Sequence, residues 1–372
     1  MEIVISLRNA IIGLLYRNLL KPILFQFDPE DVHDRITAVG TFLGKYRVLR
    51  AINRLFFGYK NSLLEQTILG IHFENPIGLS AGFDKNAVLT DITPEVGFGF
   101  EEIGSITAES CEGNPRPRLH RLPKSKSLVV YYGLKNDGAQ KIHERLKNKT
   151  FEFPIGVSIA KTNCTRTVET REGIADYIEG MKTMRDIGDY MTINISCPNT
   201  HGGEPFTDVE NLEKLLTEVD KLNIKKPIFL KISPDISREN LDAIIENVTH
   251  HNIQGFVCTN LTKNRNNPKI KDGQVPENGG LSGKIVEDLA NEMIAYVYKK
   301  THGKYVIIGS GGVFTAEDAY KKIRLGASLI QMITGMIYNG PQTISEINQG
   351  LVKLLKRDGY KTITEAIGRQ TS

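Results

Sequence analysis

The chain has 372 residues, of which 40% are hydrophobic and 24% are charged. That length fits one large α/β barrel with a small addition, and the composition is that of a folded globular protein, which excludes a disordered chain. The formal net charge is only +4 and no long block of Lys or Arg is present, so the charge gives no indication of nucleic-acid binding.

The first 25 residues are the most apolar part of the sequence, but charged and amide side chains interrupt them. A membrane-spanning helix needs about 20 nearly uninterrupted apolar residues, so we expect this segment to lie on a membrane rather than to cross it. The apolar residues near helical spacing are Val4, Leu7, Ile11, Leu14, Leu15 and Leu19, and the cations available to lipid phosphates are Arg8, Arg17 and Lys21.

A second helical stretch is expected over residues 29–57, after the breaks marked by Pro22 and Pro29. We therefore predict a small helical lobe over residues 1–60 that associates with a membrane. The alternative is that these helices only cap the main domain or form a contact between two copies of the chain.

From about residue 76, short apolar runs rich in β-forming residues alternate with helical stretches. Eight such runs begin at residues 76, 100, 155, 191, 227, 255, 305 and 328, and helices are expected near 173–187, 208–222, 237–251, 283–300 and 315–325. Continuous apolar strands that alternate with helices indicate a parallel sheet covered by helices, and eight of them indicate a closed (β/α)8 barrel, a TIM barrel. The sequence thus predicts an α/β fold with the barrel over residues 61–372. Loops over 108–127 and 198–207 are longer than barrel turns require, as active-site lids often are.

The active sites of such barrels lie at the C-terminal ends of the strands, so the residues at those ends are the candidates for function. They include Lys85, Ser105, Asn194, Cys197, Lys231, Thr259, Asn260, Gly311, Gly312 and Thr334. Glycines after the last two strands let backbone N–H groups approach a phosphate closely, although tight turns also use glycine. Lys231 is expected inside the barrel, where an ammonium either forms a salt bridge or faces a ligand.

The four cysteines are scattered without C-x-x-C spacing, so we expect neither a metal site nor a disulfide framework, and a reducing compartment is favoured. A lone cysteine is more often a buried packing residue. Cys197, however, lies in N-I-S-C-P-N-T at the end of the fourth strand and before Pro198, which favours a base or a nucleophile. Asn194, Asn199 and Asn260 either cap loops or offer donors and acceptors to a planar polar ligand.

Eight segments are specific in combination. They read N-P-I-G-L-S-A-G-F-D-K-N, E-E-I-G-S-I-T, G-N-P-R-P-R-L-H-R-L-P, N-I-S-C-P-N-T, L-K-I-S-P-D, T-N-L-T, G-G-L-S-G and I-G-S-G-G-V. With these segments the chain resembles, over nearly its whole length, dihydroorotate dehydrogenase, the FMN enzyme of de novo pyrimidine (UMP) biosynthesis. Its N-terminal extension is similar to that of the membrane-associated, quinone-dependent class 2. The resemblance implies oxidation of (S)-dihydroorotate to orotate, with electrons passed from FMN to a quinone.

The resemblance also implies roles for individual residues. The FMN site would comprise Ala81, Gly82, Lys85, Ser105, Ser158, Asn194, Lys231, Thr259, Gly283, Gly311, Gly312 and Thr334, the last three around the phosphate. Lys231 would lie at the N1/O2 edge of the flavin and stabilise the reduced, anionic ring. The substrate would be held by Lys85, Asn194, Asn199 and Asn260. Cys197 would take the C5 proton while a hydride leaves C6 for flavin N5.

A thiolate can serve as this base if its pKa is lowered toward the operating pH. In the family, the membrane-associated class usually has serine at this position and the soluble class has cysteine, so the chain combines a membrane-class extension with a soluble-class base. His33 and Arg121 match the quinone-side residues of the family, whereas Val130 and Ile333 stand where the family has asparagine and tyrosine.

The partners implied by the resemblance are dihydroorotate and orotate, a quinone and a membrane surface. In a bacterium, the protein would lie peripherally on the cytoplasmic face of the inner membrane. Two other kinds of function stay open at this point. One is a divergent FMN barrel that acts on another dihydropyrimidine or uses a soluble acceptor such as fumarate. The other is a flavin-free barrel, either a Schiff-base lyase built on Lys231 or a membrane-docked module that binds a phosphorylated ligand.

Overall fold

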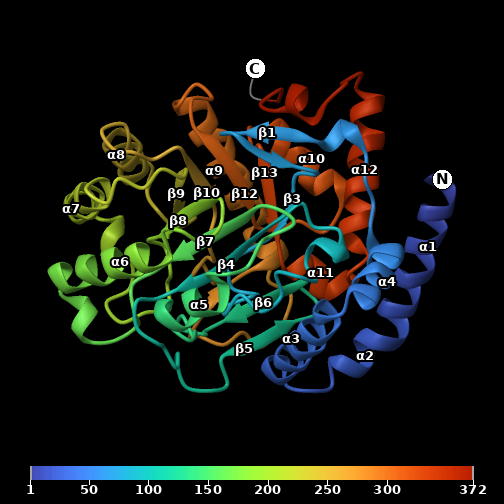
Figure 1. Cartoon of the computed structure of the whole chain (residues 1–372), viewed down its shortest axis with the longest axis horizontal. Helices are drawn as coiled ribbons and strands as arrows, with labels where there is room; N and C mark the ends of the chain where they lie inside the picture. Colours follow the sequence, from blue (N-terminus) through green and yellow to red (C-terminus); the bar gives the residue numbers. More distant parts are fainter. Residues whose placement is uncertain (1, 371–372) are drawn as a thin grey trace.

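The centre of the molecule is a closed barrel of parallel strands (Figure 1). The computed structural model describes residues 2–370. The strands follow one another around the barrel in the order β10-β12-β13-β3-β4-β7-β8-β9, which confirms the predicted eight-stranded TIM barrel. Their bounds are β3 (Ile77–Leu79), β4 (Phe100–Ile106), β7 (Ile155–Ile159), β8 (Tyr190–Asn194), β9 (Ile228–Ile232), β10 (Gly255–Cys258), β12 (Val306–Ser310) and β13 (Leu329–Met332).

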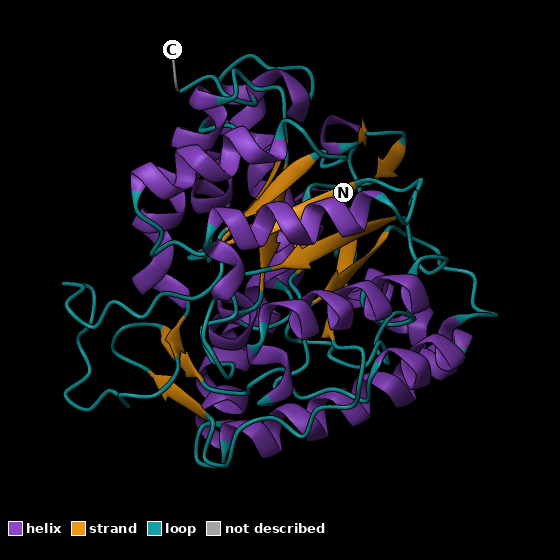
Figure 2. Cartoon of the chain, turned by 90° about the vertical axis from the view of Figure 1, so that its left-hand side faces the viewer, coloured by secondary structure: helices purple, strands orange, loops and turns teal. Residues whose placement is uncertain are grey.

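Helices surround this barrel on the outside (Figure 2). They are α5 (Ala139–Leu146), α6 (Thr170–Met184), α7 (Val209–Asp220), α8 (Arg238–Val248), α9 (Glu287–Lys300), α10 (Ala316–Arg324), α11 (Thr334–Asn339) and α12 (Thr343–Arg357). The five helical stretches predicted between the later strands appear here with shifted ends, as α6 to α10. Polar caps begin several of them, as when Thr315 and Asp318 form a capping box at α10.

Aromatic side chains fill the N-terminal end of the barrel. Phe100, Tyr190 and Phe229 lie at the beginnings of their strands and pack into one buried cluster with Phe73. Phe73 comes from the hairpin of β1 (Gln66–Ile68) and β2 (Ile71–Phe73), which therefore covers this end. Because one end of the barrel is filled, a ligand can enter only from the opposite end, where the strands terminate.

The N-terminal lobe consists of helices that lie against α12 and α11 (Figure 1). They are α1 (Glu2–Leu15), a π-helical turn over Tyr16–Leu20, α2 (Lys21–Leu24), α3 (Pro29–Lys45) and α4 (Arg47–Phe57). The single helical stretch expected over 29–57 is thus two helices, because Tyr46 adopts an extended conformation between them. By length and composition alone, the helical segment Glu2–Leu24 could also cross a membrane. We did not expect this, because charged and amide side chains interrupt its apolar residues.

Large apolar side chains are concentrated on the surface of this lobe. Among residues 2–370, those that are strongly exposed outside the lobe are Leu69 and Val168. Those in the lobe are Ile3, Val4, Leu7, Ile11, Leu14, Leu15, Leu19, Leu20, Ile23, Phe27, Ile36, Val39, Phe42, Tyr46, Val48, Ile52, Leu55 and Phe56. An exposed apolar surface of this kind marks an interaction site.

The opposite side of α1 is tied to the barrel by polar contacts. Asn9 donates to Ser345 Oγ on α12 at 3.1 Å, and the hydroxyl of Tyr16 donates to the carbonyl of Ile337 at 2.7 Å. Arg8, which we expected to be available to lipid phosphates, instead donates to the carbonyl groups of Leu55 and Gly58. That part of the prediction is wrong, because Arg8 lies on the side of α1 that faces the protein.

A small antiparallel sheet stands beside the open end of the barrel. It contains β5 (Leu119–Leu122), β6 (Ser127–Val130) and β11 (Gly280–Leu281), in the order β11-β6-β5. We expected residues 108–127 to form a loop, and β5 lies within that range. The segment L-H-R-L is too short and too polar to indicate a strand by its pattern, since only pairing with β6 stabilises it.

Candidate functional site

A pocket opens at the C-terminal ends of the barrel strands, between the barrel, the small sheet and α3. The residues singled out from the sequence that line it are His33, Ala81, Gly82, Lys85, Ser105, Asn194, Cys197, Asn199, Lys231, Thr259, Asn260, Gly283, Gly311, Gly312 and Thr334. Two others do not line it. Ser158 lies behind the wall and shares a hydrogen bond of 2.7 Å with Ser105 Oγ, and Arg121 lies outside the lining.

One end of the pocket is bounded by glycine backbone. Gly311 and Gly312 follow β12 with φ of +114° and +76°, in the left-handed region that glycine adopts without strain. A Cβ atom at Gly312 would collide with Glu287, so this close packing excludes any side chain. Gly82 has φ +106° and open space where a Cβ would be, on the pocket side. Such bare backbone is what an anionic group needs in order to approach N–H donors.

Lys231 supplies the buried cation of the pocket. It lies on β9, is 4% exposed and, among the described residues, has no ion pair. Burial lowers the pKa of Lys231, and the nearby Glu102 carboxylate is the main group that opposes that shift. Glu102 is itself fully buried and accepts hydrogen bonds from Thr192 at 3.0 Å and Gln331 at 2.9 Å. The salt bridge that was the alternative for Lys231 is therefore not formed, and its ammonium faces the pocket.

The asparagines form a connected wall on another side. Asn194 Nδ2 donates to Ser105 Oγ at 2.8 Å, and Asn260 Nδ2 donates to Asn194 Oδ1 at 3.3 Å and to the carbonyl of Ser196 at 2.6 Å. Asn199 Nδ2 donates to the carbonyl of Val130 at 2.8 Å. These bonds fix the amide planes and hold the three side chains at the pocket lining.

Cys197 follows β8 by three residues and lines the pocket between these amides. Burial raises the pKa of its thiol to about 11. The backbone N–H of Asn199 and the charges of Lys161 and Lys231 favour the thiolate, but burial outweighs them. The lowered pKa that a cysteine base requires is thus not found here; the thiol is the resting form. Lys161, which sequence reasoning missed, is nearly buried and donates to the carbonyl of His201 at 2.9 Å.

Tyr132 is a second lining residue that the sequence did not single out. The ammonium of Lys85 lies 3.7 Å from the centre of its ring, and the His33 ring contacts it edge-on at 6.5 Å between centroids. Burial lowers the pKa of Lys85 to about 8 and that of His33 to about 3, so His33 is neutral. The only signal for Tyr132 was its place just before Gly133, in the segment where Val130 departs from the family.

Arg121 lies on the side of the pocket where the lobe meets the small sheet. Its Nη1 donates to the carbonyl of Phe27 at 2.8 Å, and its guanidinium lies 4.5 Å from the centre of the Phe25 ring. The pocket wall near this side is apolar, with Leu119, Leu128 and Ile337. His33 thus lines the pocket from α3, whereas Arg121 contacts Phe25 and Phe27 of the lobe outside the lining.

Comparison with known proteins places the chain in a family. The family model described as dihydroorotate dehydrogenase matches residues 63–355. The chain belongs to this family. Dihydroorotate dehydrogenase (quinone) from Trichodesmium erythraeum is 37% identical, over 95% of this chain and 98% of the relative, and that from Haloarcula marismortui is 41% identical over 80% and 83%.

Solved structures of dihydroorotate dehydrogenase have the same fold. The chain is 30% identical to DHODH from Eimeria tenella, solved in complex with ferulenol, with a TM-score of 0.82 over 96% of this chain and 98% of that one. The ligand-free Eimeria tenella structure gives a TM-score of 0.80 over 90% and 99%. Dihydroorotate dehydrogenases are flavin-dependent, and the relatives from Trichodesmium erythraeum and Haloarcula marismortui are named as quinone-dependent enzymes.

Proposed function

We propose that this chain oxidises dihydroorotate to orotate in pyrimidine biosynthesis, with FMN as its flavin and a quinone as the electron acceptor. The observation that supports this best is the arrangement of one pocket. It combines a thiol among three amides, a buried unpaired ammonium, and glycine backbone suited to a phosphate.

The residues of the pocket fit FMN. Gly311, Gly312 and Thr334 would hold the phosphate, and Ser105, Asn194 and Lys231 line the same pocket. Ser158 would act through Ser105, to which it is hydrogen-bonded. When bound, FMN would accept the hydride from C6 of the substrate and later deliver electrons to the quinone. The remaining proposed contacts are Ala81, Gly82, Lys85, Thr259 and Gly283.

Cys197 is the proposed base for the C5 proton. Its thiol must first lose a proton, and the positive charges of Lys161 and Lys231 favour that step. Asn194, Asn199 and Asn260 would bind the ring amide groups and the carboxylate, so that C5 faces the sulfur. Lys85 adds a cation for the carboxylate at the same chamber.

The two proposed parts of the chain have different tasks. Residues 61–372 would carry the flavin and the substrate, and residues 1–60 would dock on a membrane and receive the quinone. The exposed apolar residues of the lobe support membrane docking, and the contacts of Asn9 and Tyr16 with the barrel support a peripheral helix. A quinone would enter beside His33 and Arg121, because the wall there is apolar. In a bacterium the docking surface would be the cytoplasmic face of the inner membrane.

Identification of the flavin and its reduction by substrate test this proposal. The purified protein should be yellow and should release FMN on denaturation, and dihydroorotate should bleach it without oxygen. A soluble quinone should restore the colour faster than fumarate or NAD does. A different flavin, or a flavin that dihydroorotate leaves oxidised while another dihydropyrimidine reduces it, would contradict the proposal.

A further inference from the structure

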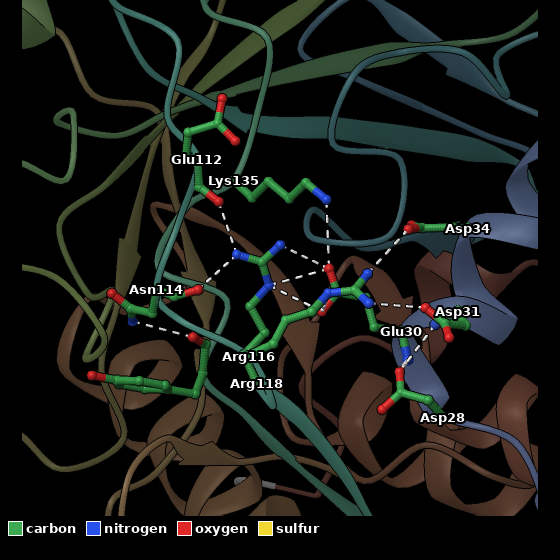
Figure 3. A network of polar contacts seen from close by, with 10 residues as sticks. Asp28, Glu30, Asp31, Asp34, Glu112, Asn114, Arg116, Arg118 and Lys135 are labelled. Carbon is green, nitrogen blue, oxygen red and sulfur yellow. Dashed lines mark hydrogen bonds and ion pairs between the residues drawn. The ribbon is translucent and has the colours of Figure 1, made fainter.

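Buried polar contacts join the helical lobe to the loop that contains Cys197, and Figure 3 shows their first part. They begin at Glu30, whose side chain lies in the first turn of α3 and is 2% exposed. Asp28 caps this turn, since its carboxylate accepts from the N–H groups of Glu30 and Asp31 at 2.9 and 3.1 Å. The start of α3 thereby directs the Glu30 carboxylate toward the barrel.

Arg118, the residue just before β5, is the main partner of Glu30. Its Nε lies 3.1 and 3.0 Å from the two carboxylate oxygens and its Nη2 lies 2.8 Å from Oε1. Arg116 and Lys135 add ion pairs at 3.1 and 3.5 Å. Burial alone would raise the pKa of Glu30, but Arg118, Arg116 and Lys135 outweigh it and lower the pKa to about 2. The carboxylate is therefore ionised throughout the physiological range.

The other side of the Arg118 guanidinium holds a turn. Its Nη1 donates to the carbonyl groups of Glu112 and Asn114 at 2.8 and 2.7 Å. The guanidinium is planar and rigid, so a carboxylate that fixes one edge also fixes the direction of the other. Loss of the Glu30 charge would leave Arg118 buried with fewer partners and free the turn to shift.

Asn114 continues the connection to the loop of the proposed base. Its Nδ2 donates to the carbonyl of Asn199 at 2.9 Å, and Asn199 is two residues after Cys197. Its Oδ1 accepts from Asn163 Nδ2 at 3.2 Å, and Asn163 Oδ1 accepts from the N–H of His201 at 2.8 Å. Two of the bonds that hold the loop over 197–201 thus lead back to Asn114, beside those of Asn199 Nδ2 with Val130 and of Lys161 with His201. We call the series Glu30, Arg118, Asn114 and Asn199 the polar chain.

We propose that Glu30 and Arg118 are positioning residues for the oxidation of dihydroorotate. Through the polar chain they hold Asn199 and the Cys197 loop at the substrate side of the pocket. Docking of α3, which belongs to the lobe proposed to receive the quinone, then completes the chamber in which the substrate reacts. This inference rests on the proposed roles of Cys197 and Asn199.

A purely structural role would have different consequences. If the ion pair served only to anchor the lobe, its loss would lower stability and quinone reduction but would leave substrate binding intact. The substrate half of the reaction, measured without quinone, therefore separates the positioning role from the purely structural role. Orotate affinity, measured at equilibrium from the flavin spectrum, provides a readout that needs no turnover.

The test uses the flavin-loaded full chain with Glu30→Gln and Asn114→Ala, and Asp31→Asn as the matched control. Asp31 lies in the same helical turn, but its partner Arg116 is half-exposed, and Arg116 keeps its own ion pair with Glu30 when the Asp31 charge is removed. Glu30→Gln and Asn114→Ala should each weaken orotate binding and slow flavin reduction by about 10-fold or more, as loss of a partner that orients a functional side chain typically does. Asp31→Asn should match the wild type in both measurements.

Wild-type orotate affinity and flavin reduction in both variants, with only quinone reduction impaired, would overturn the proposal. If Glu30→Gln does not fold, Asn114→Ala decides, because it leaves the buried ion pair in place. A third variant, Cys197→Ala, separates a failure of the proposed base from a failure of the proposed positioning role. Full flavin reduction by Cys197→Ala would refute the base, whereas the orotate affinities test the polar chain whichever residue is the base.

Discussion

The raised pKa of the Cys197 thiol predicts an unusual pH dependence for the substrate half of the reaction. With a pKa of about 11, about one molecule in a thousand carries the thiolate at pH 8, and the fraction grows about tenfold per pH unit below the pKa. The rate of flavin reduction at saturating dihydroorotate should therefore rise about tenfold per unit between pH 7 and pH 10. Stopped-flow absorbance without oxygen measures this rate directly.

Substrate affinity should follow a different profile. The pKa of Lys85 is lowered to about 8 by burial, so its charge is present below that pH and is lost above it. The dissociation constant for the anionic substrate should consequently increase above pH 8 while the limiting rate still rises. Cys164→Ala, which removes another partly exposed thiol, should leave both profiles unchanged. A limiting rate that is flat from pH 7, or that reaches a plateau by pH 8, would show that a Cys197 thiol with this raised pKa is not the group that must lose its proton.

Two further predictions concern stability and the lobe. Lys322 is fully buried with a pKa of about 7 against 10.5 in the unfolded chain, so the unfolded state binds more protons between those values and stability rises with pH in that window. Lys322→Met should therefore be more stable than the wild type at pH 7, by at most about 5 kcal/mol. In urea unfolding, this difference in stability should shrink toward pH 10. An equal difference at both pH values would contradict the prediction. Deletion of residues 1–25 should abolish vesicle binding and lower quinone turnover while flavin reduction persists, and undiminished vesicle binding would show that α1 and α2 only cap the barrel.

The barrel was predictable because its signal is local. Each buried parallel strand is a short apolar run, and the residues that follow its C-terminal end, such as Lys85 after β3 or Thr334 after β13, lie at one end of the barrel. That rule placed most of the candidate residues together. It could not place Arg121, because β5 belongs to a small sheet that exists only through pairing with β6.

The missed features depend on contacts between distant segments. Nothing in the pattern around Glu30 shows that it meets Arg118, since 88 positions separate them. The direction of the Cys197 pKa shift likewise depends on burial by the folded barrel, which outweighs two nearby lysines. Arg8 was misassigned because its helix has apolar residues toward the solvent and polar contacts toward the protein.

Removal of the C5 proton of dihydroorotate by Cys197 can be examined in the substrate half of the reaction alone. Flavin reduction by dihydroorotate is followed without oxygen in the wild type and in Cys197→Ala, after titration with orotate has shown that both bind flavin and product. We expect Cys197→Ala to retain both ligands and to lose several orders of magnitude in the rate of flavin reduction. Reduction at the wild-type rate in that variant would contradict it.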